Sequence, residues 1–124
     1  MTDRTTKPEP APLAILVRPR VYIGNEISLG PGKIDLLRWV GQTKSISAAG
    51  RELGIPYKRA WLLINTLNAG FGQPVVLTTK GGRGGGGAQL TPLGQALIER
   101  YQALEDRIVA TSAAELEALK ALAG

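Results

Sequence analysis

The sequence of 124 residues contains no cysteine and no histidine. Without these residues it can form no disulfide bond, no thiol nucleophile and no Cys/His zinc site, and it lacks the commonest general base. Hydrophobic runs are short: none approaches the roughly 20 apolar residues of a membrane-spanning helix, and residues 1–12 lack the apolar core of a signal peptide. We therefore expect a cytoplasmic protein with no metal, no cofactor and no membrane partner.

Charge is distributed unevenly along the chain. Residues 1–91 hold 12 Lys and Arg against 5 Asp and Glu, a net charge of +7, whereas residues 92–124 hold 3 against 5, a net charge of −2. A basic region favours a polyanion partner, and the acidic-leaning region favours a protein partner. A solvated basic surface explains the charge equally well, so a nucleic-acid partner has to be inferred from the motifs.

Glycines and prolines divide the sequence into short elements. Apolar spacing predicts a β-ribbon at 13–29 and three helices at 33–43, 47–53 and 56–69. Two short strands at 75–79 and 88–90 follow, and then a final helical region at 92–124. Gly54 is expected to end the second helix in the left-handed conformation, and Pro56 to start the third. Thr91 is expected to cap the final helix, with a capping box at 112–115 restarting it.

This order of elements is typical of a winged helix-turn-helix, whose third helix enters the major groove of DNA while the hairpin wing lies along the backbone. Tyr57, Lys58 and Arg59 cluster on the first turns of the third helix, where they would meet base edges and nearby phosphates. Ser47, at the start of the second helix, is expected to meet a phosphate. The alternative is a basic helix in an ordinary α/β domain.

A run of glycines at 81–87 contains Arg83 and follows Lys80. A phosphate-binding P-loop would need Lys and then Ser or Thr directly after the glycines, but Ala-Gln-Leu follows here. A flexible linker does not suit a position between two β-segments. We favour a wing, because glycine lets the backbone press against a sugar-phosphate chain and Arg can enter a narrow minor groove. Lys80 and Arg83 are therefore predicted DNA contacts.

The helix after the wing carries apolar residues spaced four, three and four apart, as in the seam of a helix pair. These residues are Leu97, Tyr101, Leu104 and Ile108. A domain this small has one core, and Trp39 and Trp61 are assigned to it. Because that core leaves little of the same chain to cover a further apolar stripe, we expect the stripe to form a homodimer. The alternative is that it packs on the N-terminal ribbon. Leu62 is predicted to be exposed in a monomer, where it contacts a thymine methyl or another element.

Residues 45–49, 54–61 and 79–91 resemble the N-terminal DNA-binding domain of ModE-type molybdate-responsive regulators, which is related to the LysR winged helix. The most specific part is Gly-Gly-Arg-Gly-Gly-Gly-Gly followed by Leu-Thr-Pro-Leu-Gly. The resemblance covers about residues 20–110 and implies a homodimer on a palindromic operator. This sequence has Pro56 at the position where members of the family often have a Ser that caps the recognition helix. The chain ends at Gly124 without the family's oxyanion-binding domains, so molybdate binding is not supported by this chain.

We therefore expect a mainly α protein with a small β component: a winged helix-turn-helix with an N-terminal β-ribbon and a long C-terminal dimerisation helix. Its expected parts are a disordered leader (1–12), a DNA-binding domain (13–91) and a dimerisation helix with a tail (92–124). The expected function is sequence-specific transcriptional regulation rather than catalysis, because no nucleophile–base spacing unites the scattered Asp, Glu and Tyr residues. The alternative is a winged-helix protein-interaction module without sequence-specific DNA recognition.

Overall fold

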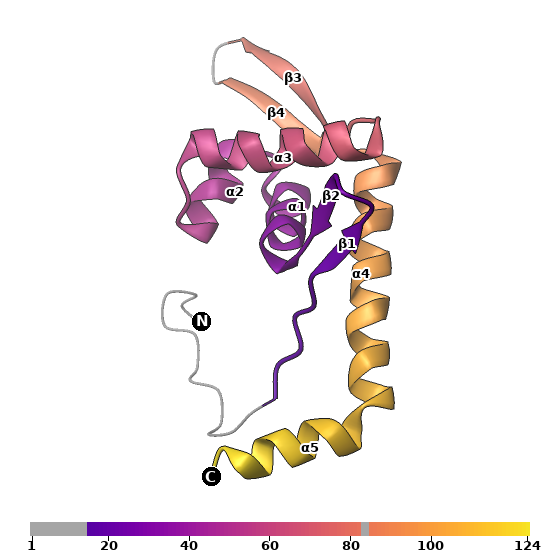
Figure 1. Ribbon diagram of the computed structural model, residues 1–124. Helices are drawn as coiled ribbons and strands as arrows, with labels where there is room; N and C mark the ends of the chain where they lie inside the picture. The colour runs from indigo at the N-terminus through magenta and orange to yellow at the C-terminus, as the bar shows by residue number, and fades with distance from the viewer. Residues whose placement is uncertain (1–14, 83–84) are drawn as a thin grey trace.

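The computed structural model describes residues 15–82 and 85–124; the expected leader (1–12) and Arg83 lie outside these ranges. The elements are β1 (Val21–Ile23), β2 (Ile27–Leu29), α1 (Pro31–Thr43), α2 (Ile46–Leu53), α3 (Tyr57–Phe71), β3 (Val76–Gly82), β4 (Gly85–Leu90), α4 (Pro92–Thr111) and α5 (Ala113–Leu122). α3 lies over α1, the β3–β4 hairpin projects beyond α3, and α4 runs along one side (Figure 1). This mainly α, winged-helix-like arrangement with two small antiparallel sheets confirms the predicted fold class.

The turn between α2 and α3 follows from local sequence. Ser45 caps α2, its hydroxyl accepting a hydrogen bond from the Ala48 N–H at 3.0 Å, so α2 begins at Ile46 rather than at 47. Gly54 ends α2 in the left-handed conformation at φ 71°, as predicted. Pro56 is the N-cap of α3 and not its first helical residue, since its ψ of 152° is extended.

The end of α3 differs from the prediction. α3 continues through Gly70 to Phe71, and Gly72, at φ 70°, is the left-handed residue that ends it. Gly70 instead serves a close approach to β2: a Cβ there would lie 2.8 Å from Cγ1 of Ile27. The glycine therefore reflects packing and not helix termination.

The wing strands are longer than predicted. β3 and β4 pair from Val76↔Leu90 to Gly82↔Gly85, with an irregularity between 79 and 82. Several glycines of the run therefore lie in strands, where the antiparallel hydrogen-bond ladder outweighs the low strand propensity of glycine. The prediction of a capping box at 112–115 was wrong in one detail. The helical region is interrupted at Ser112, between α4 and α5, but the Ser112 side chain makes no capping hydrogen bond.

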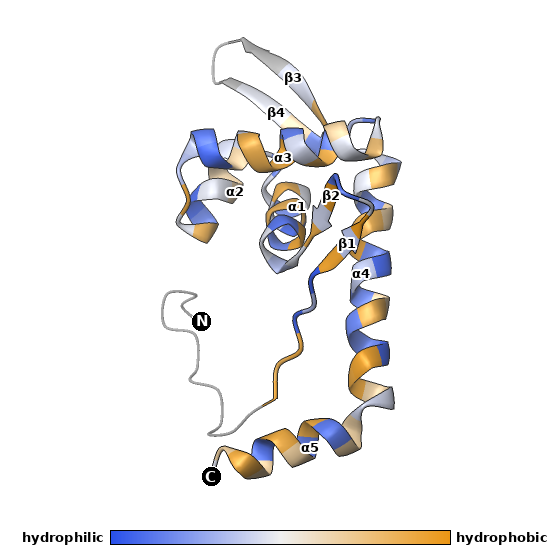
Figure 2. Cartoon of the chain, viewed as in Figure 1, coloured by the Kyte–Doolittle hydropathy of each residue, from blue (hydrophilic) through white to orange (hydrophobic). Residues whose placement is uncertain are grey.

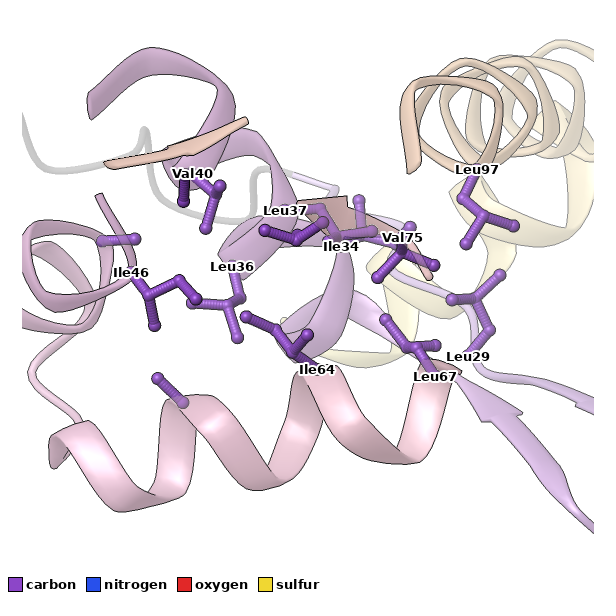
Figure 3. Close-up of a cluster of buried hydrophobic side chains, with 14 of the residues drawn as sticks. Leu29, Ile34, Leu36, Leu37, Val40, Ile46, Ile64, Leu67, Val75 and Leu97 are labelled. Atoms are coloured by element: carbon purple, nitrogen blue, oxygen red, sulfur yellow. The ribbon is translucent and has the colours of Figure 1, made fainter. Parts of the chain in front are cut away.

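One hydrophobic core joins α1, α2, α3 and the first half of α4 (Figure 3). Its most completely buried large side chains are Ile34, Leu36, Leu37, Val40, Ile64, Leu67 and Val75. Trp39 and Trp61 are partly buried against this cluster, which confirms their assignment to the core. The core supports α3 from beneath, and the opposite face of that helix remains in solvent.

The first half of the predicted dimer stripe belongs to this core. Leu97 and Tyr101 are only 9% and 3% exposed within the single chain, and the Tyr101 hydroxyl donates a hydrogen bond to the Pro19 carbonyl. Burial, and next the Glu105 carboxylate, raise the pKa of Tyr101, which keeps it a protonated donor. Both residues are therefore buried by their own chain, and the bond from Tyr101 to Pro19 corresponds to the alternative of packing on the N-terminal segment. Leu104 remains 37% exposed.

Polar contacts fix α4 against α1. The Arg38 guanidinium donates to Gln102 Oε1 at 2.8 Å and lies 3.7 Å from the Glu105 carboxylate. On its own helix Arg38 also contacts Asp35 at 3.3 Å, and Arg18 pairs with the same carboxylate. This network adds polar contacts to the apolar packing between α1 and α4.

Residues 90–94 attach the base of the wing to α4. The Thr91 hydroxyl donates to the Pro74 carbonyl at 2.8 Å and accepts from the Gly94 N–H at 3.0 Å, which caps α4 as predicted. The Thr91 N–H donates to the Val75 carbonyl at 3.0 Å. A Cβ on Gly94 would lie 2.2 Å from that same carbonyl oxygen. Glycine is required here because backbone meets backbone.

Candidate nucleic-acid interface

α3 presents an exposed stripe on the side away from the core. Ala60, Ile64 and Leu67 bury its inner face. The stripe consists of Lys58, Leu62, Asn65 and Ala69, spaced four, three and four apart and all exposed. Leu62 is 51% exposed, as predicted for a single chain. A cation, an amide and an apolar group on one helix face supply the chemistry that reads guanine, adenine and the thymine methyl.

Asn65 was missed in the sequence. It lies seven residues after Lys58, two helical turns along the same face, and that spacing is the signal that could have identified it. Asn68, nearly one turn further on, has a structural role instead, because its side-chain oxygen accepts a hydrogen bond from the Val75 N–H at 2.8 Å. Asn65 is the exposed amide on α3.

The predicted residues at the start of α3 lie together. Tyr57, Lys58 and Arg59 are all exposed on its first turn. The Tyr57 ring meets the Trp61 ring edge-on, with centroids 6.3 Å apart and an interplanar angle of 84°, which orients the phenol. Ser47 is exposed on α2, where its hydroxyl accepts a hydrogen bond from Arg51 Nη1 at 2.9 Å. Of the predicted wing residues, Lys80 lies in β3.

The base of the wing is anchored to the end of α1. The Ala88 N–H donates to the carbonyl of Lys44, the left-handed C-cap of α1, at 2.9 Å. Across the hairpin, the Thr79 hydroxyl accepts from the Gly87 N–H at 3.0 Å. These bonds therefore fix the base of the wing relative to α1, the helix that α3 covers.

A pocket of about 420 Å³ opens beside α3. Its lining is Arg20, Gly32, Lys33, Arg59, Leu62, Leu63 and Thr66. The Lys33 ammonium donates to the Ser28 carbonyl at 2.7 Å, while burial, and then the charges of Arg20 and Arg59, lower the pKa of Lys33 below its ordinary value. Arg20 and Lys33 were missed because they come from separate segments with no shared periodicity.

The described residues contain no cluster of acidic side chains placed to hold a metal ion. The Asp35 carboxylate is engaged in the ion pairs with Arg18 and Arg38. In the same part of the chain no helix has the length and apolar character needed to cross a membrane.

Several known proteins are similar in sequence, although the chain matches no protein-family model. It is 47% identical over 77 residues to the molybdenum-pterin-binding protein MopB of Rhodobacter capsulatus, a match covering 62% of this chain and 28% of MopB. It is 43% identical over 74 residues to the DNA-binding transcriptional dual regulator ModE of Escherichia coli (strain K12), covering 60% and 28%. The transcriptional regulator ModE of Haemophilus influenzae is 31% identical over 85 residues, covering 68% and 33%.

These relatives are named as transcriptional regulators and molybdenum-pterin-binding proteins, and not as enzymes. The chain spans no more than a third of the length of each of them.

Proposed function

We propose that this chain is a sequence-specific, DNA-binding transcriptional regulator that acts as a homodimer on a palindromic site. The observation that carries the proposal is the exposed stripe of α3, held away from the core with Tyr57, Lys58 and Arg59 at its start. The major groove is wide enough to admit an α-helix. The similarity to ModE regulators supports the same function.

Each candidate residue has a role in this arrangement. Lys58 and Asn65 read base edges, and Leu62 contacts a thymine methyl. Tyr57 and Arg59 flank the stripe and meet phosphates, as does Ser47 from α2. Lys80 and Arg83 belong to the wing, along the adjacent backbone. The contacts thus divide into those that specify sequence and those that position the protein.

Replacing Asn65 by Ala is expected to relax base preference at one A·T position, reducing discrimination there by about 1–3 kcal/mol. The reason is that an amide can pair with N6 and N7 of adenine at the same time, which alanine cannot. The measurement is selection of bound sequences from a randomised site library. Arg59→Ala is the matched comparison and should weaken binding evenly over all sequences.

If Asn65→Ala and Arg59→Ala gave the same sequence profile, the division of roles on α3 would be wrong. A wild-type chain that bound DNA without any sequence preference would favour the protein-interaction module instead.

The dimer is proposed to form through the second half of α4 together with α5. Beyond Tyr101, α4 leaves the core, and apolar residues recur along it and along α5 (Figure 2). The exposed ones are Leu104, Val109, Leu119 and Leu122, with Ile108 half-buried. A two-fold axis here would relate two copies of α3 by about one turn of DNA, roughly 34 Å, or a multiple of it.

Leu104→Glu is expected to produce a folded monomer without cooperativity between half-sites, because it places a charge in the proposed interface and not in the core. Sedimentation at micromolar concentration measures the first effect, and binding to a full palindrome against a single half-site measures the second. Ala96→Glu, at an exposed position on the first half of α4, is the control and should remain dimeric. A wild-type species of 13.1 kDa would contradict the dimer.

A further inference from the structure

The pocket beside α3 brings together three cations from three parts of the chain. Arg20 precedes β1, Lys33 lies in the first turn of α1, and Arg59 lies in the first turn of α3. Arg20 folds back over the start of α1: a Cβ on Gly30 would lie 2.7 Å from its Nη1 atom and 3.0 Å from its Cζ atom. Glycine at position 30 therefore leaves space for the Arg20 guanidinium over the start of α1.

The pocket cations differ from the other arginines of the same region. Arg18 and Arg38 are paired with the Asp35 carboxylate, whereas no carboxylate of the described residues forms a salt bridge with Arg20, Lys33 or Arg59. Among the residues that the structure describes, none of those lining the pocket is acidic. Like charges held close together are unfavourable without a counter-charge. The pKa of Lys33 is lowered first by burial and then by the charges of Arg20 and Arg59. The pocket thus has the electrostatic character of an anion site.

The position of the pocket is related to that of the wing. The pocket includes Gly32 and Lys33 at the start of α1, and the wing is bonded to Lys44 at its end. α1 has 13 residues, a length of about 20 Å, and α3 crosses over it (Figure 1). The wing and the pocket therefore lie at opposite ends of the helix beneath α3. A helix in the major groove likewise has a sugar-phosphate backbone on each side.

We propose that Arg20, Lys33 and Arg59 form a phosphate-binding pocket that receives a DNA backbone phosphate on the side of α3 opposite the wing. The two guanidinium groups donate paired hydrogen bonds to phosphate oxygens, and the ammonium adds its remaining N–H donors beyond the one given to Ser28. The assignment of DNA as the source rests on the proposed function. A free phosphate has the same chemistry, so the experiment has two arms.

The first arm measures DNA affinity against salt concentration for the full chain and for the Arg20→Gln/Lys33→Gln double variant. The variant should bind more weakly on all sequences, and its slope of log K against log salt should be shallower by about 0.9 for each phosphate that is no longer neutralised, or about 1.8 for a dimer. Arg59 stays intact, so the stripe of α3 is undisturbed. Arg100→Gln, which removes an exposed cation on α4, should change neither quantity. An unchanged slope in the double variant would overturn the DNA assignment.

The second arm titrates inorganic phosphate into the chain without DNA, with NMR shifts of the residue 20, 33 and 59 amides as the readout. Saturable shifts that disappear in the double variant support the pocket as a phosphate site. If the DNA slope were unchanged while the wild type showed these shifts and the double variant did not, the ligand would be a free phosphate. If both arms showed no difference, the pocket proposal would be overturned. A wild type that failed to bind DNA would contradict the proposed function alone, because the phosphate titration still tests the pocket.

Discussion

The affinity of this chain for its DNA site is expected to fall about 10³-fold as salt rises from 50 to 200 mM. Each phosphate neutralised by Lys or Arg releases condensed counterions, so log K falls with log salt at about −0.9 per contact. The proposal places three such contacts on each protomer: the pocket of Arg20, Lys33 and Arg59, and the wing residues Lys80 and Arg83. A dimer therefore makes six.

Fluorescence anisotropy of a labelled palindromic duplex over this range of salt measures the effect. Leu104→Glu serves as an internal control, because a monomer on one half-site should show about half the slope of the wild type. Binding to duplex DNA that did not depend on salt would remove the electrostatic basis of the proposed interface.

Gly94→Ala is expected to lower the free energy of unfolding by about 3 kcal/mol, with a fall in Tm on the order of 10 °C. The added Cβ would lie 2.2 Å from the Val75 carbonyl oxygen and 3.2 Å from its carbon. Since both atoms belong to the backbone, the strain cannot be relieved by turning a side chain. Movement of either segment would also disturb the Thr91 cap and the base of the wing.

Thermal and urea denaturation followed by circular dichroism measure this destabilisation. Gly32→Ala is the matched control, because a Cβ there has no neighbour within 4 Å. It lies in the first turn of α1, and alanine should leave stability unchanged or raise it by a few tenths of a kcal/mol. If Gly94→Ala were as stable as the wild type, the close backbone contact could not be a constraint on the fold.

Features that depend on neighbours in sequence were predictable. Gly54 ends α2 and Thr91 caps α4 because a left-handed turn and a capping hydroxyl act within one helical turn. The β-ribbon predicted within 13–29 is present, with β1 and β2 paired antiparallel from Val21↔Leu29 to Ile23↔Ile27. The exposed side of α3 follows from helical periodicity, which is why the exposure of Leu62 could be predicted.

Features that depend on distant partners were not predictable. The spacing of Leu97 and Tyr101 is compatible with a dimer seam and with packing on the N-terminal ribbon, and the sequence did not decide between them; in the structure Tyr101 bonds to Pro19, 82 residues away in sequence. The role of Gly70 likewise depends on Ile27 in β2.

The sequence by itself determined the order of the elements, the caps at Gly54 and Thr91 and the basic start of α3. Only the tertiary structure decided which apolar residues of α4 are buried, and only it brought Arg20, Lys33 and Arg59 to one pocket. The physical reason is range: capping and periodicity act over three or four residues, whereas burial and charge clustering depend on which segments the folded chain places side by side.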